Sequence, residues 1–224
     1  MSRTIAVLRP EPGNAATAAR IEALGLTAIR LPLFELHALD WIPPDAASFD
    51  ALLLTSANTL HHAGPGLDAF EHLPAYAVGG ATAAAARGAG LDVIEIGERD
   101  GAALIETAAE RGVQRALLLG GRDRAVDHHP IIAATIAVYA SEPVAVPVEA
   151  LDRLAGSVVL LHSPRAARRF ADLVDRAGLD RKNMRLAAIS QAAADAAGDG
   201  WGGIGAAPLP NDDALIALAR AQAD

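Results

Sequence analysis

The sequence contains no cysteine, which excludes disulfide bonds, thiolate nucleophiles and cysteine-ligated metals. Aromatic residues are also scarce, at 4% of the 224 residues, whereas 52% of the residues are hydrophobic. The core must therefore be built from alanine, leucine, valine and isoleucine, as is typical of helices packed on buried parallel strands. The length suits one large domain or two small ones.

The sequence also lacks an export signal, a membrane span and an excess of basic over acidic residues. Its first nine residues have no signal-peptide apolar core or cleavage site. No apolar run approaches the roughly 20 residues that a spanning helix needs. Nucleic-acid binding normally uses a basic face, but the formal net charge here is −8. We therefore expect a cytoplasmic protein with no membrane or nucleic-acid partner, and a monomer, because nothing demands an oligomer.

Metal and nucleotide signatures are missing as well. The seven histidines are dispersed or form adjacent pairs, at 61–62 and 128–129. Neither pair has the i, i+4 spacing that places two imidazoles on one helix face. Gly79-Gly80 lacks the spacing of dinucleotide-binding and phosphate-binding loops. We expect no metal and no nucleotide cofactor.

What the sequence does contain is one strand–serine–helix pattern written twice. Residues 50–58 read DALLLTSAN and residues 157–165 read SVVLLHSPR. An unbroken apolar run of this length indicates a buried parallel strand, and the hydroxyl and amide residues after it are good helix N-caps. Open α/β sheets bind ligands where parallel strands end and helices begin. The repeat predicts two similar half-molecules, each contributing to a binding site.

The rest of the chain alternates strand and helix patterns, which indicates an α/β fold with parallel sheets. Asn14 is the expected cap of the first helix and Asn211 that of the last. The expected strands cover residues 4–8, 27–31, 48–54, 75–78, 91–96, 115–119, 158–161, 186–189 and 202–206, and the expected helices cover 15–24, 57–63, 83–87, 101–111, 129–135, 164–177, 190–197 and 212–221.

Two extended stretches that contain proline, 32–40 and 136–146, fit exposed strands that cross between domains. Four strand–helix units lie between them, whereas the opening of the chain has too few strands to stand alone. We expect residues 1–35 and 146–224 to form one discontinuous domain and residues 40–138 to form a second, inserted domain. The two crossings then make a two-stranded ladder, and such a hinge permits a cleft to open and close.

The internal repeat extends to a second pair of segments. Residues 77–83 read AVGGATA and residues 188–194 read AISQAAA, in the same order as the first pair and at nearly the same separation. Each is a short strand, a small residue and the start of an alanine-rich helix.

These motifs together resemble the uroporphyrinogen-III synthase family over nearly the whole chain. The resemblance implies two flavodoxin-like parallel-sheet domains, one of them discontinuous, joined by a two-stranded ladder. The matching pieces are Val7-Leu8-Arg9-Pro10 with Gly13, Leu54-Thr55-Ser56-Ala57-Asn58, Val78-Gly79-Gly80-Ala81-Thr82-Ala83, Gly121-Arg122-Asp123, Val138-Tyr139-Ala140-Ser141-Glu142-Pro143, Leu161-His162-Ser163-Pro164 and Ala188-Ile189-Ser190.

The resemblance also implies an activity, the reaction of a cyclising lyase in heme biosynthesis. The linear tetrapyrrole hydroxymethylbilane is closed to uroporphyrinogen III, with inversion of ring D and loss of water, and without a cofactor. The family tyrosine that is proposed to help the hydroxyl leave falls on Tyr139. The chain departs from the family pattern at Ser190 and Ala193, where the family has a glycine and a threonine, so one side-chain contact is missing.

The substrate carries an acetate and a propionate on each pyrrole, so the acidic protein must concentrate its positive groups. Free N–H groups at helix N-termini and arginines near strand ends suit these carboxylates, and small residues let a large ligand approach the backbone. The expected catalytic residue is Tyr139, and the expected substrate-binding residues are Arg9, Thr55, Ser56, Asn58, Gly79, Gly80, Thr82, Arg122, Ser163, Arg165, Arg185 and Ser190.

Other interpretations stay open at the level of the sequence. Ser56 and Ser163 can be plain helix caps, Tyr139 a packed edge-strand aromatic, and each arginine a solvated surface residue. His162 precedes Ser163, but neighbours on one strand point to opposite faces, so no Ser-His-Asp triad is expected. A non-catalytic hinged binding protein and an inactive relative, suggested by Ala193, are the alternative functions.

Overall fold

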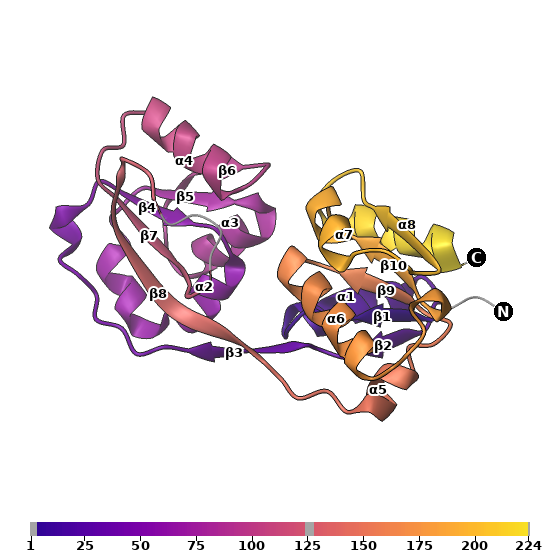
Figure 1. The fold of residues 1–224 in the computed structure, drawn as a ribbon. Helices are drawn as coiled ribbons and strands as arrows, with labels where there is room; N and C mark the ends of the chain where they lie inside the picture. The colour runs from indigo at the N-terminus through magenta and orange to yellow at the C-terminus, as the bar shows by residue number, and fades with distance from the viewer. Residues whose placement is uncertain (1–3, 124–127, 224) are drawn as a thin grey trace. The chain divides into compact units, whose positions relative to one another are not determined.

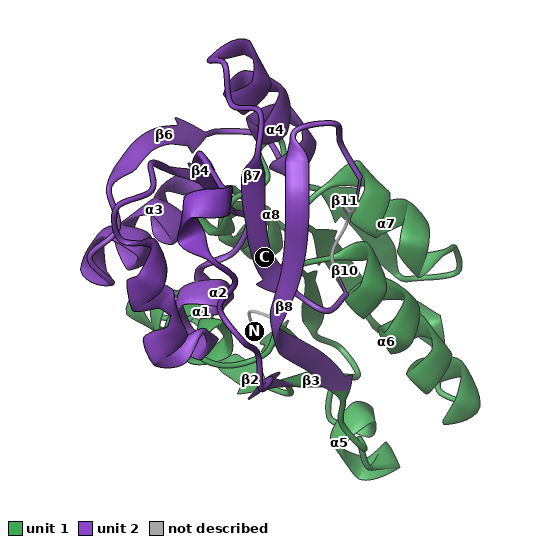
Figure 2. Cartoon of the chain, turned by 90° about the vertical axis from the view of Figure 1, so that its left-hand side faces the viewer, with its two compact units in different colours: residues 1–35, 143–224 green, residues 36–142 purple. Residues whose placement is uncertain are grey.

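The computed structural model describes residues 4–123 and 128–223 and divides the chain into two compact units (Figures 1 and 2). Unit 1 consists of residues 1–35 and 143–224, and unit 2 consists of residues 36–142. The chain therefore passes between the units twice, after Glu35 and after Glu142.

Unit 1 is built on a five-stranded parallel sheet in the order β11-β10-β9-β1-β2. Numbered along unit 1 alone, this order is 5-4-3-1-2, the flavodoxin-like arrangement. The strands are β1 (Ile5–Val7), β2 (Ala28–Arg30), β9 (Val158–Leu161), β10 (Arg185–Ala188) and β11 (Gly203–Ala206).

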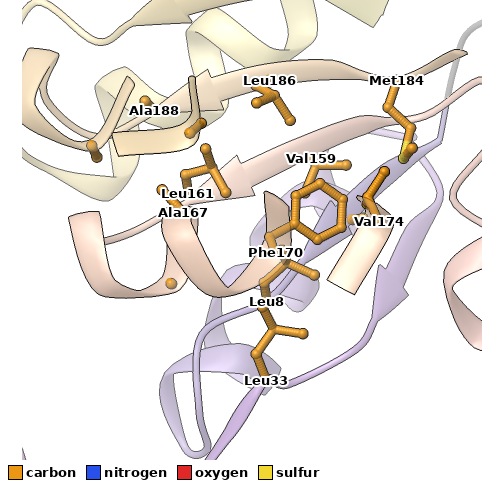
Figure 3. Packing of buried hydrophobic residues seen from close by; sticks show 14 of the residues in the cluster. Leu8, Leu33, Val159, Leu161, Ala167, Phe170, Val174, Met184, Leu186 and Ala188 are labelled. Carbon is orange, nitrogen blue, oxygen red and sulfur yellow. The ribbon is translucent and has the colours of Figure 1, made fainter. Parts of the chain in front are cut away.

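Helices cover both faces of the unit 1 sheet, because its strand residues are apolar on both sides. Leu160 belongs to the buried cluster under α1 and α8, while its neighbour Leu161 belongs to the cluster under α5, α6 and α7. Figure 3 shows this second cluster, in which the Phe170 ring of α6 lies beside Val159. The helices are α1 (Gly13–Ala23), α5 (Val148–Asp152), α6 (Pro164–Arg176), α7 (Gln191–Ala197) and α8 (Asp212–Ala223), with a 3-10 turn at Arg181–Asn183.

Unit 2 contains a six-stranded sheet in the order β3-β8-β7-β4-β5-β6, in which β4 to β8 pair in parallel. Its strands are β3 (Phe34–Ala38), β4 (Ala51–Leu54), β5 (Ala75–Val78), β6 (Val93–Gly97), β7 (Ala116–Gly121) and β8 (Ile132–Pro143). Its helices are α2 (Ala57–His62), α3 (Gly79–Gly88) and α4 (Gly101–Glu110), with 3-10 segments at Ala46–Ser48 and Gly64–Phe70.

Strands β3 and β8 carry the two crossings and lie side by side. The Leu39 N–H donates to the Val138 carbonyl at 2.9 Å, and the Val144 N–H donates to the Leu33 carbonyl at 3.1 Å. Going along the chain from Leu33 through β3 to Leu39, the bonded residue of the other crossing goes back from Val144 to Val138, so the pairing is antiparallel. The predicted fold class, two parallel-sheet α/β domains joined by a two-stranded ladder, is confirmed.

The helix predicted at residues 129–135 is wrong, because strand β8 begins at Ile132 and runs for 12 residues. Its first half pairs with β7, from Ala116 opposite Ile132 to Leu119 opposite Ile136. A short run of alanine, isoleucine and threonine has no period that separates helix from strand, and pairing with a buried neighbour decides the outcome.

Asn14 has a different role from the predicted helix cap. Helix α1 begins at Gly13, so Asn14 lies inside the helix and is fully buried. Its side-chain amide donates to the carbonyls of Val7 at 2.8 Å and Arg9 at 2.9 Å. Asn14 therefore secures the end of β1 and the loop after it. By contrast, Asn211 does cap α8, through a 2.9 Å bond from the Ala214 N–H.

Among the described residues, none of the helices combines the length and the apolarity needed to cross a bilayer.

Candidate functional site

Each sheet has one point at which its strand order reverses, and most of the predicted site residues lie at the strand ends around it. In unit 1 the chain goes from β1 to β2 on one side and returns to β9 on the other. In unit 2 it goes from β4 to β5 and returns to β7. The carboxyl ends of the strands at such a reversal border a crevice in open α/β sheets, which makes them the favoured ligand position.

In unit 2, three neighbouring strand ends carry predicted residues. Thr55 and Ser56 follow β4, Gly79 and Gly80 open α3 directly after β5, and Arg122 follows β7. Because β5, β4 and β7 are adjacent and parallel, these residues share one edge of the sheet.

In unit 1, the carboxyl ends of the strands carry a second group of predicted residues. They are Arg9 after β1, Ser163 and Arg165 after β9, and Ser190 after β10. Arg185 does not join them, because it is the first residue of β10 and therefore lies at the opposite edge. Its guanidinium donates to the Gln222 carbonyl at 2.8 Å. We leave Arg185 out of the proposed site.

The three serines are helix caps. Ser56 Oγ accepts a 3.2 Å hydrogen bond from the backbone N–H of Asn58, another predicted binding residue. Ser163 and Ser190 accept from the N–H three residues on, at 3.1 Å and 3.3 Å. Capping uses an oxygen lone pair, so each hydroxyl keeps its proton for a ligand carboxylate.

At the start of α3, glycine is required for conformation and leaves open space. Gly79 has φ +76°, a left-handed conformation that residues with side chains rarely adopt. No atom lies within 4 Å of the position that a Cβ would take at Gly79 or at Gly80. Thr82, by contrast, is buried in α3 together with Ala83 and Ala86. The glycines are therefore the accessible part of this segment.

Tyr139 lies on β8 directly opposite Gly121, the last residue of β7. The Arg122 N–H donates to the Tyr139 carbonyl at 2.8 Å, and the Arg122 guanidinium pairs with Glu142. The Tyr139 ring lies 5.7 Å, centroid to centroid, from the ring of His62 at the end of α2. The tyrosine is thus half-buried, paired across the strands with Gly121 and in ring contact with His62.

A network of charged and polar side chains surrounds Asp212, the first residue of α8. Asp212 Oδ1 lies 3.0 Å from His162 Nε2 and 3.6 Å from the Arg9 guanidinium. Its Oδ2 accepts from the Thr17 hydroxyl at 2.9 Å and from the Arg20 guanidinium at 3.0 Å. One carboxylate therefore connects the end of β1, the end of β9 and helix α1.

Arg9 is held by this network and by Gly13. A Cβ at Gly13 would stand 2.5 to 2.8 Å from the Arg9 guanidinium atoms, so any larger residue at 13 would make that side chain shift from its present position. The Thr17 hydroxyl also accepts from Arg9, at 3.5 Å. The guanidinium at the end of β1 consequently has a defined position.

Burial and ion pairing shift the pKa values of the central pair. Burial lowers the pKa of His162, the hydrogen bond to Asp212 opposes this, and the charge of Arg9 adds to the lowering. Burial alone would raise the pKa of Asp212, but hydrogen bonds from His162 and Thr17 and the charge of Arg9 outweigh it and lower that pKa. A neutral imidazole beside an ionised carboxylate follows, with the proton on Nε2.

This pair predicts a pH dependence of stability in unit 1. The pKa of His162 is lower folded than unfolded, so unfolded chains bind more protons, and stability is lost as the pH falls below about 6.5. We expect the free energy of unfolding to fall by about 1 kcal/mol from pH 7.5 to 5.5, and by clearly less in His162→Gln. Urea titrations followed by Trp201 fluorescence in a Trp41→Phe background check this, with the exposed His72→Gln as control. Equal pH slopes in His162→Gln and the parent would contradict it.

The Arg165 guanidinium stacks over the Phe34 ring, 4.5 Å from its centroid. This contact attaches the start of α6 to the first crossing strand. Phe34 is buried, so the arginine stem covers apolar surface while its position at the second residue of α6 stays close to Ser163.

No group of three or more histidine, aspartate or glutamate residues in the described ranges is arranged to hold a metal ion.

Comparison with known proteins decides the family. The family model for uroporphyrinogen-III synthase HemD matches residues 15–217. The chain belongs to this family. No curated protein sequence is similar enough to count as a match.

Two solved structures of uroporphyrinogen-III synthases share the fold. The enzyme from Helicobacter pylori is 17% identical with a TM-score of 0.66, covering 98% of this chain and 99% of that one. A mutant enzyme from the extremely thermophilic bacterium Thermus thermophilus is 16% identical with a TM-score of 0.54, covering 98% of each chain. At these identities the likeness concerns the fold.

Several residues around the candidate site were missed by reasoning from the sequence. Asp212 lies 50 residues from His162, and only the packing of α8 on β9 joins them. The sequence places His62 in a surface pair, yet it contacts Tyr139. No local pattern signals either contact, because both depend on which elements become neighbours.

Proposed function

We propose that this chain is a uroporphyrinogen-III synthase, a lyase that closes hydroxymethylbilane to uroporphyrinogen III. The observation that carries the proposal is the family match over residues 15–217, which takes in most of both units. The family places the protein in tetrapyrrole biosynthesis. We further propose that it acts as a cytoplasmic monomer and without a cofactor.

The chemistry asks little acid–base power of the protein. A pyrrole nitrogen pushes out the terminal hydroxyl, so the carbon–oxygen bond breaks and a stabilised cation remains. The departing oxygen needs one proton, which a tyrosine hydroxyl can share. The cationic carbon then bonds to the ring D carbon that already carries the bridge from ring C. That bridge bond breaks and re-forms at the free carbon of ring D, which loses its proton, so ring D is inverted and the net loss is water. We assign the proton donor to Tyr139.

The larger demand is to hold a flexible chain so that the correct carbon attacks, which is an orientation effect. The substrate carboxylates fit the groups at the strand ends of each unit. In unit 1 these are the Ser163 hydroxyl, the N–H groups that open α6 and the fixed guanidinium of Arg9. In unit 2 they are Ser56 and the open backbone at Gly79 and Gly80.

A product assay tests this function. Freshly made hydroxymethylbilane is incubated with the protein, the products are oxidised, and the type I and type III isomers are separated. Unaided closure gives the type I isomer, so a dominant type III product supports the proposal. Only type I product from folded protein would overturn it and leave an inactive relative or a hinged binding protein.

The position of the site is tested at Ser56. We expect Ser56→Trp to raise KM more than tenfold, because a bulky indole after β4 would hinder a large ligand from approaching this strand end. Ser56→Thr is the matched control, since it keeps the capping oxygen without the bulk. Steady-state kinetics on both variants, with circular dichroism to verify folding, decide the matter. An unchanged KM in folded Ser56→Trp would place the site elsewhere.

A further inference from the structure

The Tyr139 ring lies against a surface that has no side chain. A Cβ at Gly121 would stand 2.8 Å from Tyr139 Cζ, 2.9 Å from Cε2 and 3.0 Å from the hydroxyl oxygen. Real Cβ contacts are essentially never shorter than 3.0 Å, so the hydroxyl end of the ring occupies the space that any other residue at 121 would fill. Gly121 and Tyr139 are cross-strand partners, which fixes this closeness by register.

A second contact comes from helix α2. The His62 ring lies 5.7 Å from the Tyr139 ring with an interplanar angle of 34°, a tilted aromatic arrangement. Burial lowers the pKa of His62, and the nearby His61 and His37 add to the effect. The imidazole is therefore neutral near pH 7 and packs on the phenol as an aromatic ring.

We propose that Gly121 and His62 are positioning residues that hold the Tyr139 hydroxyl where the leaving hydroxyl of the substrate departs, an inference that rests on the proposed synthase function. Gly121 lets the hydroxyl end of the ring lie against the end of β7, and His62 limits the rotation of the ring. Both act through Tyr139.

Gly121→Ala separates positioning from folding. The atoms in conflict with the new methyl group are at the far end of a side chain, so the tyrosine can turn away while the strands stay paired. We expect kcat to fall about 10²-fold, the order found when a catalytic group is misplaced by about 1 Å, with KM changed less than twofold. The control is Gly88→Ala at the end of α3, where no atom lies within 4 Å and φ is not positive.

A double-mutant cycle tests whether the effect passes through Tyr139. If it does, Gly121→Ala lowers kcat about 10²-fold in the parent but less than threefold in Tyr139→Phe, because the hydroxyl is already gone. Equal losses in both backgrounds, or a folded Gly121→Ala with parental kcat, would overturn the proposal. Only type I product from the parent would instead reject the synthase function itself.

Substitutions at His62 give an independent test that leaves strand pairing untouched. We expect His62→Ala to lower kcat about tenfold with an unchanged KM, and His62→Phe, which keeps a ring, to restore most of it. His61→Ala, on the neighbouring residue, controls for the loss of an imidazole at this helix end. If His62→Ala matches His61→Ala in kcat, His62 has no positioning role.

Discussion

Tyr139→Phe should lower kcat for type III product about 10²-fold while KM and stability stay close to those of the parent. The substitution removes one hydroxyl and keeps the ring that packs against Gly121 and His62. Loss of a positioned proton donor costs roughly 10² to 10⁴ in rate, and the low end applies here because the pyrrole nitrogen supplies most of the driving force. The groups proposed to bind the substrate carboxylates are untouched.

The chain offers a matched control, because it has two tyrosines. Tyr76 lies on β5 with only 3% of its surface exposed, in the core cluster under α4. Tyr76→Phe should leave kcat and KM unchanged. Single-turnover assays with isomer analysis give the comparison. Equal turnover in Tyr139→Phe and the parent would remove Tyr139 from the mechanism, and a rise in KM alone would make it a binding residue.

The sequence was sufficient to predict features that are encoded locally. Apolar runs ending in a hydroxyl predicted β4 and β9, and Ser56 and Ser163 cap the helices after them. A buried strand must be apolar on both faces and a helix must satisfy its first N–H groups, so both signals lie within a few residues. The fold class followed from their alternation along the chain.

Features that depend on tertiary neighbours could not be predicted in this way. The first half of β8 becomes a strand because β7 is beside it. Arg185 is a different case, because it directly precedes the strand predicted over 186–189. Its position at the amino end of β10, away from Ser190, could therefore have been inferred from the sequence. The contact of Tyr139 with Gly121 requires the β7–β8 register, which a bulge between Gly120 and Gly121 shifts by one residue.

Asp212→Ala should destabilise unit 1 by about 2 kcal/mol. The Asp212 side chain is 18% exposed, and its loss leaves His162, Thr17 and Arg9 without their shared acceptor. Hydrogen bonds to a charged group are worth about 1.5 to 3 kcal/mol, and His162, with 9% of its side chain exposed, has little access to water as a substitute. The contribution of the half-exposed Arg20 is screened and small.

Asp213→Ala is the control, because the two aspartates are adjacent in the first turn of α8 and interact similarly with the helix dipole. Asp213 is 87% exposed and pairs only with Arg20 among the described residues, so its loss should cost about 0.5 kcal/mol or less. Urea unfolding followed by Trp201 in a Trp41→Phe background reports on unit 1 alone, since Trp41 belongs to unit 2. Equal effects at 212 and 213 would show that the network adds nothing beyond the dipole. A larger effect at 212, with a raised KM for hydroxymethylbilane, would show that the carboxylate that stabilises the fold also orients Arg9 toward the substrate.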